Sequence, residues 1–90
     1  MTIAEPFFGS PQDYDAFRRL LGSDLPDTRN EWLQFQIERR LPELVQAGHV
    51  VRQTIVKPDE FVRYCRKIGA SSDLQALRDF AAAKHAGEHY

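Results

Sequence analysis

The sequence predicts a mainly α-helical fold with four helices and one short β-strand. Four segments carry apolar residues at helical spacing between clear helix starts and stops, whereas residues 49–56 (HVVRQTIV) alternate as a strand does. A lone strand leaves backbone groups unpaired, so it needs a partner within the chain or on a second copy. We expect residues 50–56 to pair antiparallel with their own copy about the two-fold axis of a homodimer.

Length and composition indicate one small domain. The 90 residues divide into an N-terminal helical segment, 1–48, and a strand-helix-helix segment, 49–90. The net charge is −1, of which the first segment contributes −3 and the second +2. Cys65 has no partner in the chain and no apolar leader is found, so we expect a reduced, cytoplasmic protein. No apolar run reaches the roughly 20 residues that cross a membrane.

The first helix is predicted from Ser10-Pro11, a cap followed by proline at the first helical position, to Gly22. Before it, residues 1–9 read as an extended stretch. Pro6 restricts that stretch to an edge strand or a packed arm, because proline has no N–H to give to a central strand.

The second helix begins at a Thr28-x-x-Glu31 capping box and ends at Gly48. Its apolar stripe follows helical spacing, and Pro42 should kink or split it. Trp32 and Phe35 lie beside this stripe. They either anchor the core or form an exposed surface for a protein partner.

In the strand, period-two geometry places Val51 and Ile55 on an inner face and Arg52 and Thr54 on an outer face. Gln53 interrupts the apolar face. A third helix follows from Pro58 to Gly69, and a fourth is capped by Ser71 or Ser72 and ends near Gly87.

Residues 50–85, which run as strand, proline at a helix start, helix, Gly-Ala-Ser-Ser loop and helix, resemble the ribbon-helix-helix family of DNA-binding proteins. In that family two chains form an antiparallel ribbon that enters the major groove. The resemblance implies that Arg52, Thr54 and Val56 point outward, with Arg52 and Thr54 contacting bases. It also implies that Ser71 and Ser72 position a phosphate.

Lys57 would add positive charge beside this ribbon, whereas Asp73, next to the serines, departs from the family pattern. The resulting hypothesis is a small DNA-binding regulator or an antitoxin-like protein. The alternative is a non-enzymatic interaction or assembly module that uses Trp32 and Phe35 or its dimer seam.

We expect no enzyme activity, cofactor or metal. The string from His85 to His89 (HAGEH) has metal-ligand spacing, but Gly87 interrupts the helix that would have to carry it. Cys65 shares the apolar stripe of the third helix, which favours a buried structural thiol over a nucleophile.

Overall fold

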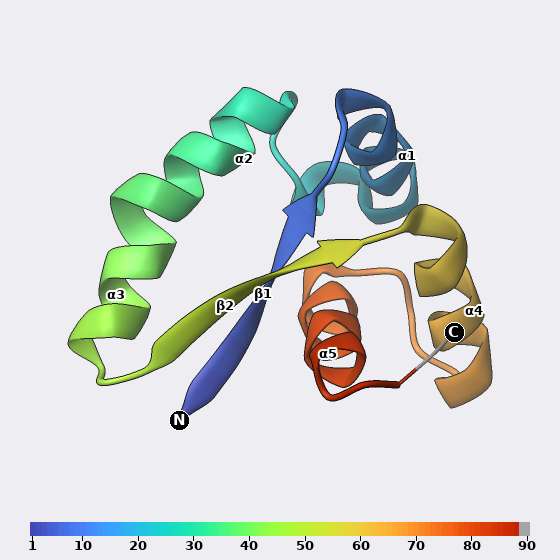
Figure 1. The fold of residues 1–90 in the computed structure, drawn as a ribbon. Helices are drawn as coiled ribbons and strands as arrows, with labels where there is room; N and C mark the ends of the chain where they lie inside the picture. The colour runs from blue at the N-terminus through green and yellow to red at the C-terminus, as the bar shows by residue number, and fades with distance from the viewer. Residues whose placement is uncertain (89–90) are drawn as a thin grey trace.

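A computed structural model describes residues 1–88 of the chain. In order, the elements are β1 (Thr2–Phe8), α1 (Pro11–Leu21), the 3-10 turn η1 (Gly22–Asp24), α2 (Arg29–Phe35), the π turn η2 (Gln36–Arg40), α3 (Leu41–Gln46), β2 (Val50–Val56), α4 (Pro58–Ile68) and α5 (Leu74–His85). The segments α2, η2 and α3 run on as one long helix on one side of the two strands, with the other helices opposite (Figure 1). The described residues thus form four helices, as predicted, but two strands.

The strand predicted at residues 50–56 is confirmed, and its partner is the N-terminal segment of the same chain. β1 pairs with β2 in parallel, with Thr2 opposite Val50 and Phe8 opposite Val56. The expectation of a lone strand is therefore wrong. Pairing within the chain already satisfies one edge of β2, so the need for a partner no longer by itself argues for a dimer.

Two helix starts follow local sequence signals. The Ser10 hydroxyl accepts a hydrogen bond from the Asp13 N–H at 3.2 Å, and the Thr28 hydroxyl accepts one from the Glu31 N–H at the same distance. These caps satisfy amides that have no partner within the helix. The predicted starts of α1 and α2 are confirmed.

The loop between α4 and α5 ends one helix as predicted and begins the next differently. Gly69 adopts φ 70°, a left-handed conformation that favours glycine, and its N–H donates to the Cys65 carbonyl. Asp73, rather than Ser71 or Ser72, caps α5, because its carboxylate accepts the Ala76 N–H at 2.8 Å. A carboxylate at this position also complements the helix dipole.

The interruption predicted from Pro42 takes the form of a π turn directly before it. Pro42 has no N–H to donate to the preceding turn. The Leu41 N–H donates to the Gln36 carbonyl, five residues back, and the helix continues into α3. A wider turn of this kind changes which side chains share a face, and such turns recur at functional positions.

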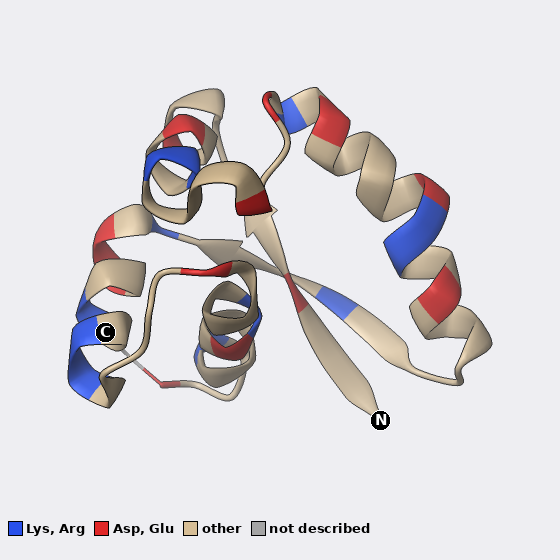
Figure 2. Cartoon of the chain, turned by 180° about the vertical axis from the view of Figure 1, so that it is seen from behind, with Lys and Arg blue, Asp and Glu red and all other residues tan. Residues whose placement is uncertain are grey.

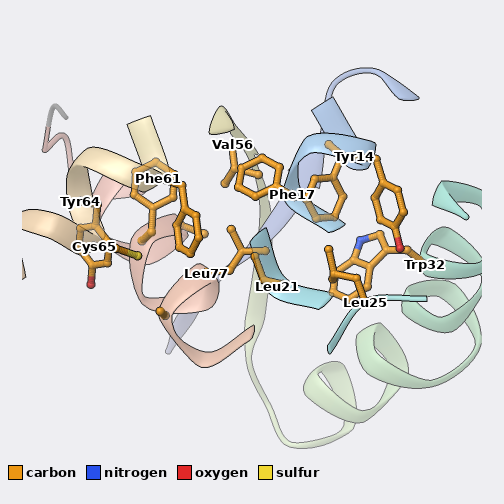
Figure 3. Packing of buried hydrophobic residues seen from close by; sticks show 14 of the residues in the cluster. Tyr14, Phe17, Leu21, Leu25, Trp32, Val56, Phe61, Tyr64, Cys65 and Leu77 are labelled. Carbon is orange, nitrogen blue, oxygen red and sulfur yellow. The ribbon is translucent and has the colours of Figure 1, made fainter. Parts of the chain in front are cut away.

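The core lies between β1 and the helices α1, α2, α4 and α5. The Phe8 ring packs on those of Tyr14, Phe17 and Trp32 at centroid distances of 4.9, 5.2 and 5.6 Å. Figure 3 shows Val56 among the aromatic side chains of this cluster, and its side chain is fully buried. Aromatic and aliphatic burial of this kind is the main stabilising contribution in a small domain.

The two faces of β2 are opposite to those predicted. Paired positions of neighbouring strands share a face, so Val56 lies beside Phe8, on the core side together with Thr54. Ile55 is 50% exposed on the other face. The expectation that Val56 points outward is wrong, because its neighbour across the sheet is the central ring of the core. Gln53 is exposed and lies on the same face as Ile55, away from the aromatic core, so its polarity is no anomaly.

No helix within residues 1–88 is long and apolar enough to cross a membrane. The same residues contain no cluster of histidine, cysteine and carboxylate side chains suited to a metal ion. His89, which completes the HAGEH string, lies outside the described residues.

Candidate functional site

One edge of β2 carries backbone groups that have no hydrogen-bond partner within residues 1–88. Along a strand, the N–H and C=O of successive residues point to opposite edges. The Val50 N–H donates to the Met1 carbonyl at 2.9 Å, so the backbone N–H and C=O groups of the even-numbered residues of β2 point toward β1. The groups of Val51, Gln53 and Ile55 therefore face away from β1. We call these three residues the open edge of β2.

The C-terminal half of the outer edge of β1 is closed by contrast. The same alternation directs the even-numbered residues of β1 away from β2. Among them, Pro6 has no N–H, and the Phe8 carbonyl accepts two hydrogen bonds from Arg29, at 3.1 Å from Nε and 2.9 Å from Nη2. Proline and a capping side chain both hinder the addition of a further strand.

The open edge has few of the features that protect exposed strands. β2 contains no proline or glycine, and its only charged residue is Arg52, whose side chain lies on the opposite face from Gln53. Val50 and Ile55 are 49% and 50% exposed. An apolar seven-residue edge of this kind is a template for pairing with another strand.

The long helix exposes apolar side chains on the same side of the sheet. Glu5, which shares a face with Gln53, contacts Gln36 and Arg40, so the long helix lies over this face. Along the helix, Ile37 is 67% exposed and Val45 is 63% exposed. Exposed apolar side chains such as these are available for contact with another chain.

Three residues predicted to contact nucleic acid lie on or next to β2 and differ in availability. Arg52 is exposed. Thr54 is half-buried on the core side of the sheet, and Lys57 forms an ion pair with Asp13 at 3.3 Å. The family resemblance implied that these residues share one outward surface, and the structure does not place them on one.

The two serines expected to position a phosphate lie beside a helix start that already holds carboxylates. Asp73 accepts the Ala76 N–H, and Asp24 accepts the Leu74 N–H at 3.0 Å. Negative charge thus occupies the place that a phosphate would need. Burial raises the pKa of the Cys65 thiol, and the nearby Ser72 side chain opposes this shift.

Of the two residues expected to contact a protein partner, only Phe35 reaches the surface. Trp32 is 2% exposed and packs on Phe8. It is therefore a core anchor, and the alternative that it forms a surface contact is wrong. Phe35 is 38% exposed, with its ring 6.0 Å from that of Trp32.

Charge is interspersed over the chain. Figure 2 shows both acidic and basic residues on the helices, and in α4 the acids lie at the start and the basic residues toward the end. Comparison with protein-family models, curated proteins and solved structures finds no match. The functional proposal therefore rests on the geometry of the site. Val51 and Ile55, two residues of the open edge, were predicted to lie on the inner face of the strand, but Ile55 is 50% exposed. The polar Gln53 within an apolar alternation was the signal of the exposed face.

Proposed function

We propose that this chain is a non-enzymatic assembly module that forms a homodimer through the open edge of β2. The observation that supports the proposal is the contrast between the two sheet edges. The outer edge of β1 is closed at Pro6 and Phe8, whereas the open edge of β2, with Val51 and Ile55 on either side of Gln53, has no hydrogen-bond partner within residues 1–88. A two-stranded sheet is marginal alone, and pairing of two copies makes a four-stranded one.

The sequence of the open edge suits antiparallel pairing with itself. A two-fold axis at Gln53 places it opposite Gln53 of the second copy, and Val51 opposite Ile55 of that copy. All three residues direct both backbone groups to the seam, so the pair gains about six hydrogen bonds. Val-Ile neighbours and facing glutamine amides are favourable cross-strand pairs.

A seven-residue ribbon is small for a stable dimer. Stable interfaces bury roughly 800 Å² on each partner. We therefore expect the exposed apolar side chains of the ribbon, Val50 and Ile55, which are 49% and 50% exposed, to be buried in the dimer together with neighbouring surface. Their burial would supply most of the affinity, and the hydrogen bonds would set the register.

The experiment is a solution mass by light scattering over a range of concentrations. We expect a dimer for the native chain and a monomer for Ile55→Lys, since a lysine on an edge strand opposes pairing. Ile68→Lys is the matched control, because Ile68 is 51% exposed but lies at the end of α4. A native monomer, or a dimer that Ile55→Lys leaves intact, would contradict the proposal.

A second variant guards against misfolding of the first. Gln53→Pro removes one N–H from the open edge without touching the ladder between β1 and β2, as Pro6 does on the other strand. The variant should be a folded monomer by circular dichroism and light scattering. A Gln53→Pro chain that folds and still dimerises would exclude this seam.

DNA binding is the second candidate function, favoured by the exposed Arg52 on β2. A duplex titration at low salt tests it separately. If the chain reads DNA, binding should weaken steeply with salt, and Arg52→Ala should reduce sequence preference. If no duplex binds, only the assembly module is left.

A further inference from the structure

A buried carboxylate lies where β1, the long helix and α5 meet. Glu5 is 0% exposed. Its Oε1 accepts a hydrogen bond from Gln36 Nε2 at 3.2 Å and another from Arg40 Nε at 3.0 Å. Both donors come from the π turn η2. A buried charge needs such partners, because removal from water is costly.

The second oxygen of this carboxylate is not satisfied. Glu5 Oε2 is buried and has no hydrogen-bond partner among the described residues, and the same holds for Arg78 Nε. The two atoms are 3.9 Å apart, an ion-pair distance that is too long for a hydrogen bond. Buried polar atoms in folded proteins are nearly always paired, so this pair indicates a position where another polar group belongs.

The buried carboxylate is outnumbered by its cationic partners, while Asp79, which also lines the hollow, accepts a hydrogen bond from Gln75. One carboxylate serves two guanidinium groups, those of Arg40 and Arg78, whose side chains are 26% and 22% exposed. The pKa of Arg78 is lowered, first by desolvation and then by the positive charge of Arg40, and Glu5 opposes this only in part. An added anion would relieve the repulsion between the two arginines.

A hollow of about 380 Å³ opens over this group, in the size range of small-molecule sites. Glu5, Arg40 and Arg78 line it, together with Thr2 of β1 and with Gln75 and Asp79 of α5. Within each of the two guanidinium groups, Nε is the nitrogen that contacts a polar group of the described residues. Their terminal nitrogens are therefore donors for a ligand.

We propose that this hollow binds a small carboxylate that carries a hydrogen-bond donor on the adjacent carbon, the chemistry shared by α-hydroxy and α-amino acids. The ligand carboxylate accepts hydrogen bonds from both guanidinium groups, a geometry that arginine favours. The hydroxyl or amino group donates to Glu5 Oε2, which is buried, so binding requires the adjacent Arg78 side chain to shift. A doubly charged phosphate is disfavoured, because the Glu5 and Asp79 carboxylates line the same hollow.

This site is independent of the proposed dimer seam. The hollow is lined by residues of β1, and the seam lies on the open edge of β2, on the other side of the two-stranded sheet. A monomeric protein could therefore still bind the ligand, and a dimer could lack it. Failure of either proposal leaves the other open to its own test.

The test compares the binding of three carboxylates with three carbons each. Binding is measured from amide chemical shifts in NMR titrations. Lactate carries an α-hydroxyl, alanine an α-ammonium, and propionate neither. We expect lactate or alanine to cause saturable shifts at Thr2 and around Arg78, with dissociation constants on the order of millimolar, and propionate to bind about ten-fold more weakly. Equal binding of all three, or of inorganic phosphate, would overturn the ligand class.

Two variants locate the binding. Arg78→Gln removes a guanidinium that makes no hydrogen bond, so the fold should persist while affinity falls about ten-fold or more. Arg66→Gln, on the exposed surface of α4, is the control and should bind as the native chain does. Absence of saturable shifts with lactate and alanine, or unchanged affinity in Arg78→Gln, would overturn the site.

Asp79→Asn distinguishes the two ligand classes, which differ in whether the donor is an α-ammonium or an α-hydroxyl group. If the ligand is an α-amino acid, loss of this carboxylate should weaken alanine binding, because the ammonium loses a nearby negative charge. If it is an α-hydroxy acid, lactate should bind more tightly, since one repelling charge has been removed. An Asp79→Asn chain with unchanged affinity for both would exclude Asp79 from the site.

Discussion

Glu5 and Arg40 are 35 positions apart in the sequence, yet Arg40 Nε donates a hydrogen bond to Glu5 Oε1 at 3.0 Å. The contact ties the long helix to β1 at the π turn. Because the Glu5 side chain is fully buried, the bond is also the main compensation for placing that charge inside the protein.

Replacing Glu5 with alanine should therefore destabilise the fold strongly. Both guanidinium groups would lose their shared carboxylate, and we expect a loss of about 3 kcal/mol in the free energy of unfolding. Glu5→Gln keeps an acceptor for Arg40 and should cost less. Urea denaturation measures both. Glu43→Ala, an exposed change in α3, should shift stability by no more than about 0.5 kcal/mol. Equal losses for Glu5→Ala and Glu43→Ala would refute the role given to Glu5.

Trp32 and Phe35 should respond differently to truncation although they are neighbours in α2. Trp32→Ala opens a cavity in the core and should cost about 3 to 5 kcal/mol of unfolding free energy. Phe35 is 38% exposed, so Phe35→Ala should cost about 1 kcal/mol. Thermal or urea unfolding of the two variants decides this, and a mild effect of Trp32→Ala would return that residue to the surface role.

Alkaline conditions should weaken the fold through Tyr14. Its hydroxyl donates to the Pro26 carbonyl at 2.6 Å, and burial raises its pKa from 10.0 to about 12, with the charge of Arg18 opposing the shift. The folded state holds the proton more tightly than the unfolded state does. The stabilisation is therefore present below pH 10 and is lost as pH rises from 10 to 12.

Tyr14→Phe should reduce stability at neutral pH by about 1 kcal/mol, since it removes one hydrogen bond. It should also flatten the decline between pH 10 and 12. Burial raises the pKa of Tyr64 as well, so a smaller decline should persist. Urea unfolding at pH 7 and at several values above 10 gives both quantities, and an unchanged alkaline slope would speak against the role of Tyr14.

A cysteine at position 53 should report the register of the proposed seam. In a hydrogen-bonded antiparallel pair the facing Cα atoms are about 5.5 Å apart, within the range of disulfides. Gln53→Cys should then form a covalent dimer on mild oxidation, seen on a non-reducing gel. Thr54→Cys is the control, because Thr54 of one copy faces Arg52 of the other and its side chain lies toward the core. The buried Cys65 should stay reduced in both. Cross-linking at 54 and not at 53 would require another register.

The helix boundaries follow from neighbouring residues, which is why the sequence predicts them well. Ser10, Thr28 and Gly69 act on amides or carbonyls within one helical turn, so their effect is visible in a short stretch of chain. The cap of α5 is the exception. The predicted caps were Ser71 or Ser72, and the observed cap is the next residue, Asp73.

Strand pairing and the charged hollow depend on residues far apart in the chain. Pairing with the segment from Thr2 to Phe8 was therefore predicted only as the alternative for a monomer, and its parallel register and the hollow were not predicted. Nothing near Val56 indicates that Phe8 will lie beside it, and without that partner the face of the strand cannot be assigned. Glu5 shows the same difficulty. A single acid in an extended stretch reads as solvent-exposed until Arg40 and Arg78 are brought to it by the fold.

The parallel pairing of β1 with β2 sets an order for biosynthesis. Thr2 leaves the ribosome before Val50, which follows only after α1 and the long helix have been made. β1 must therefore wait unpaired, with Phe7 and Phe8 uncovered, until β2 has emerged. An unpaired strand with exposed aromatic side chains is prone to aggregation during that interval.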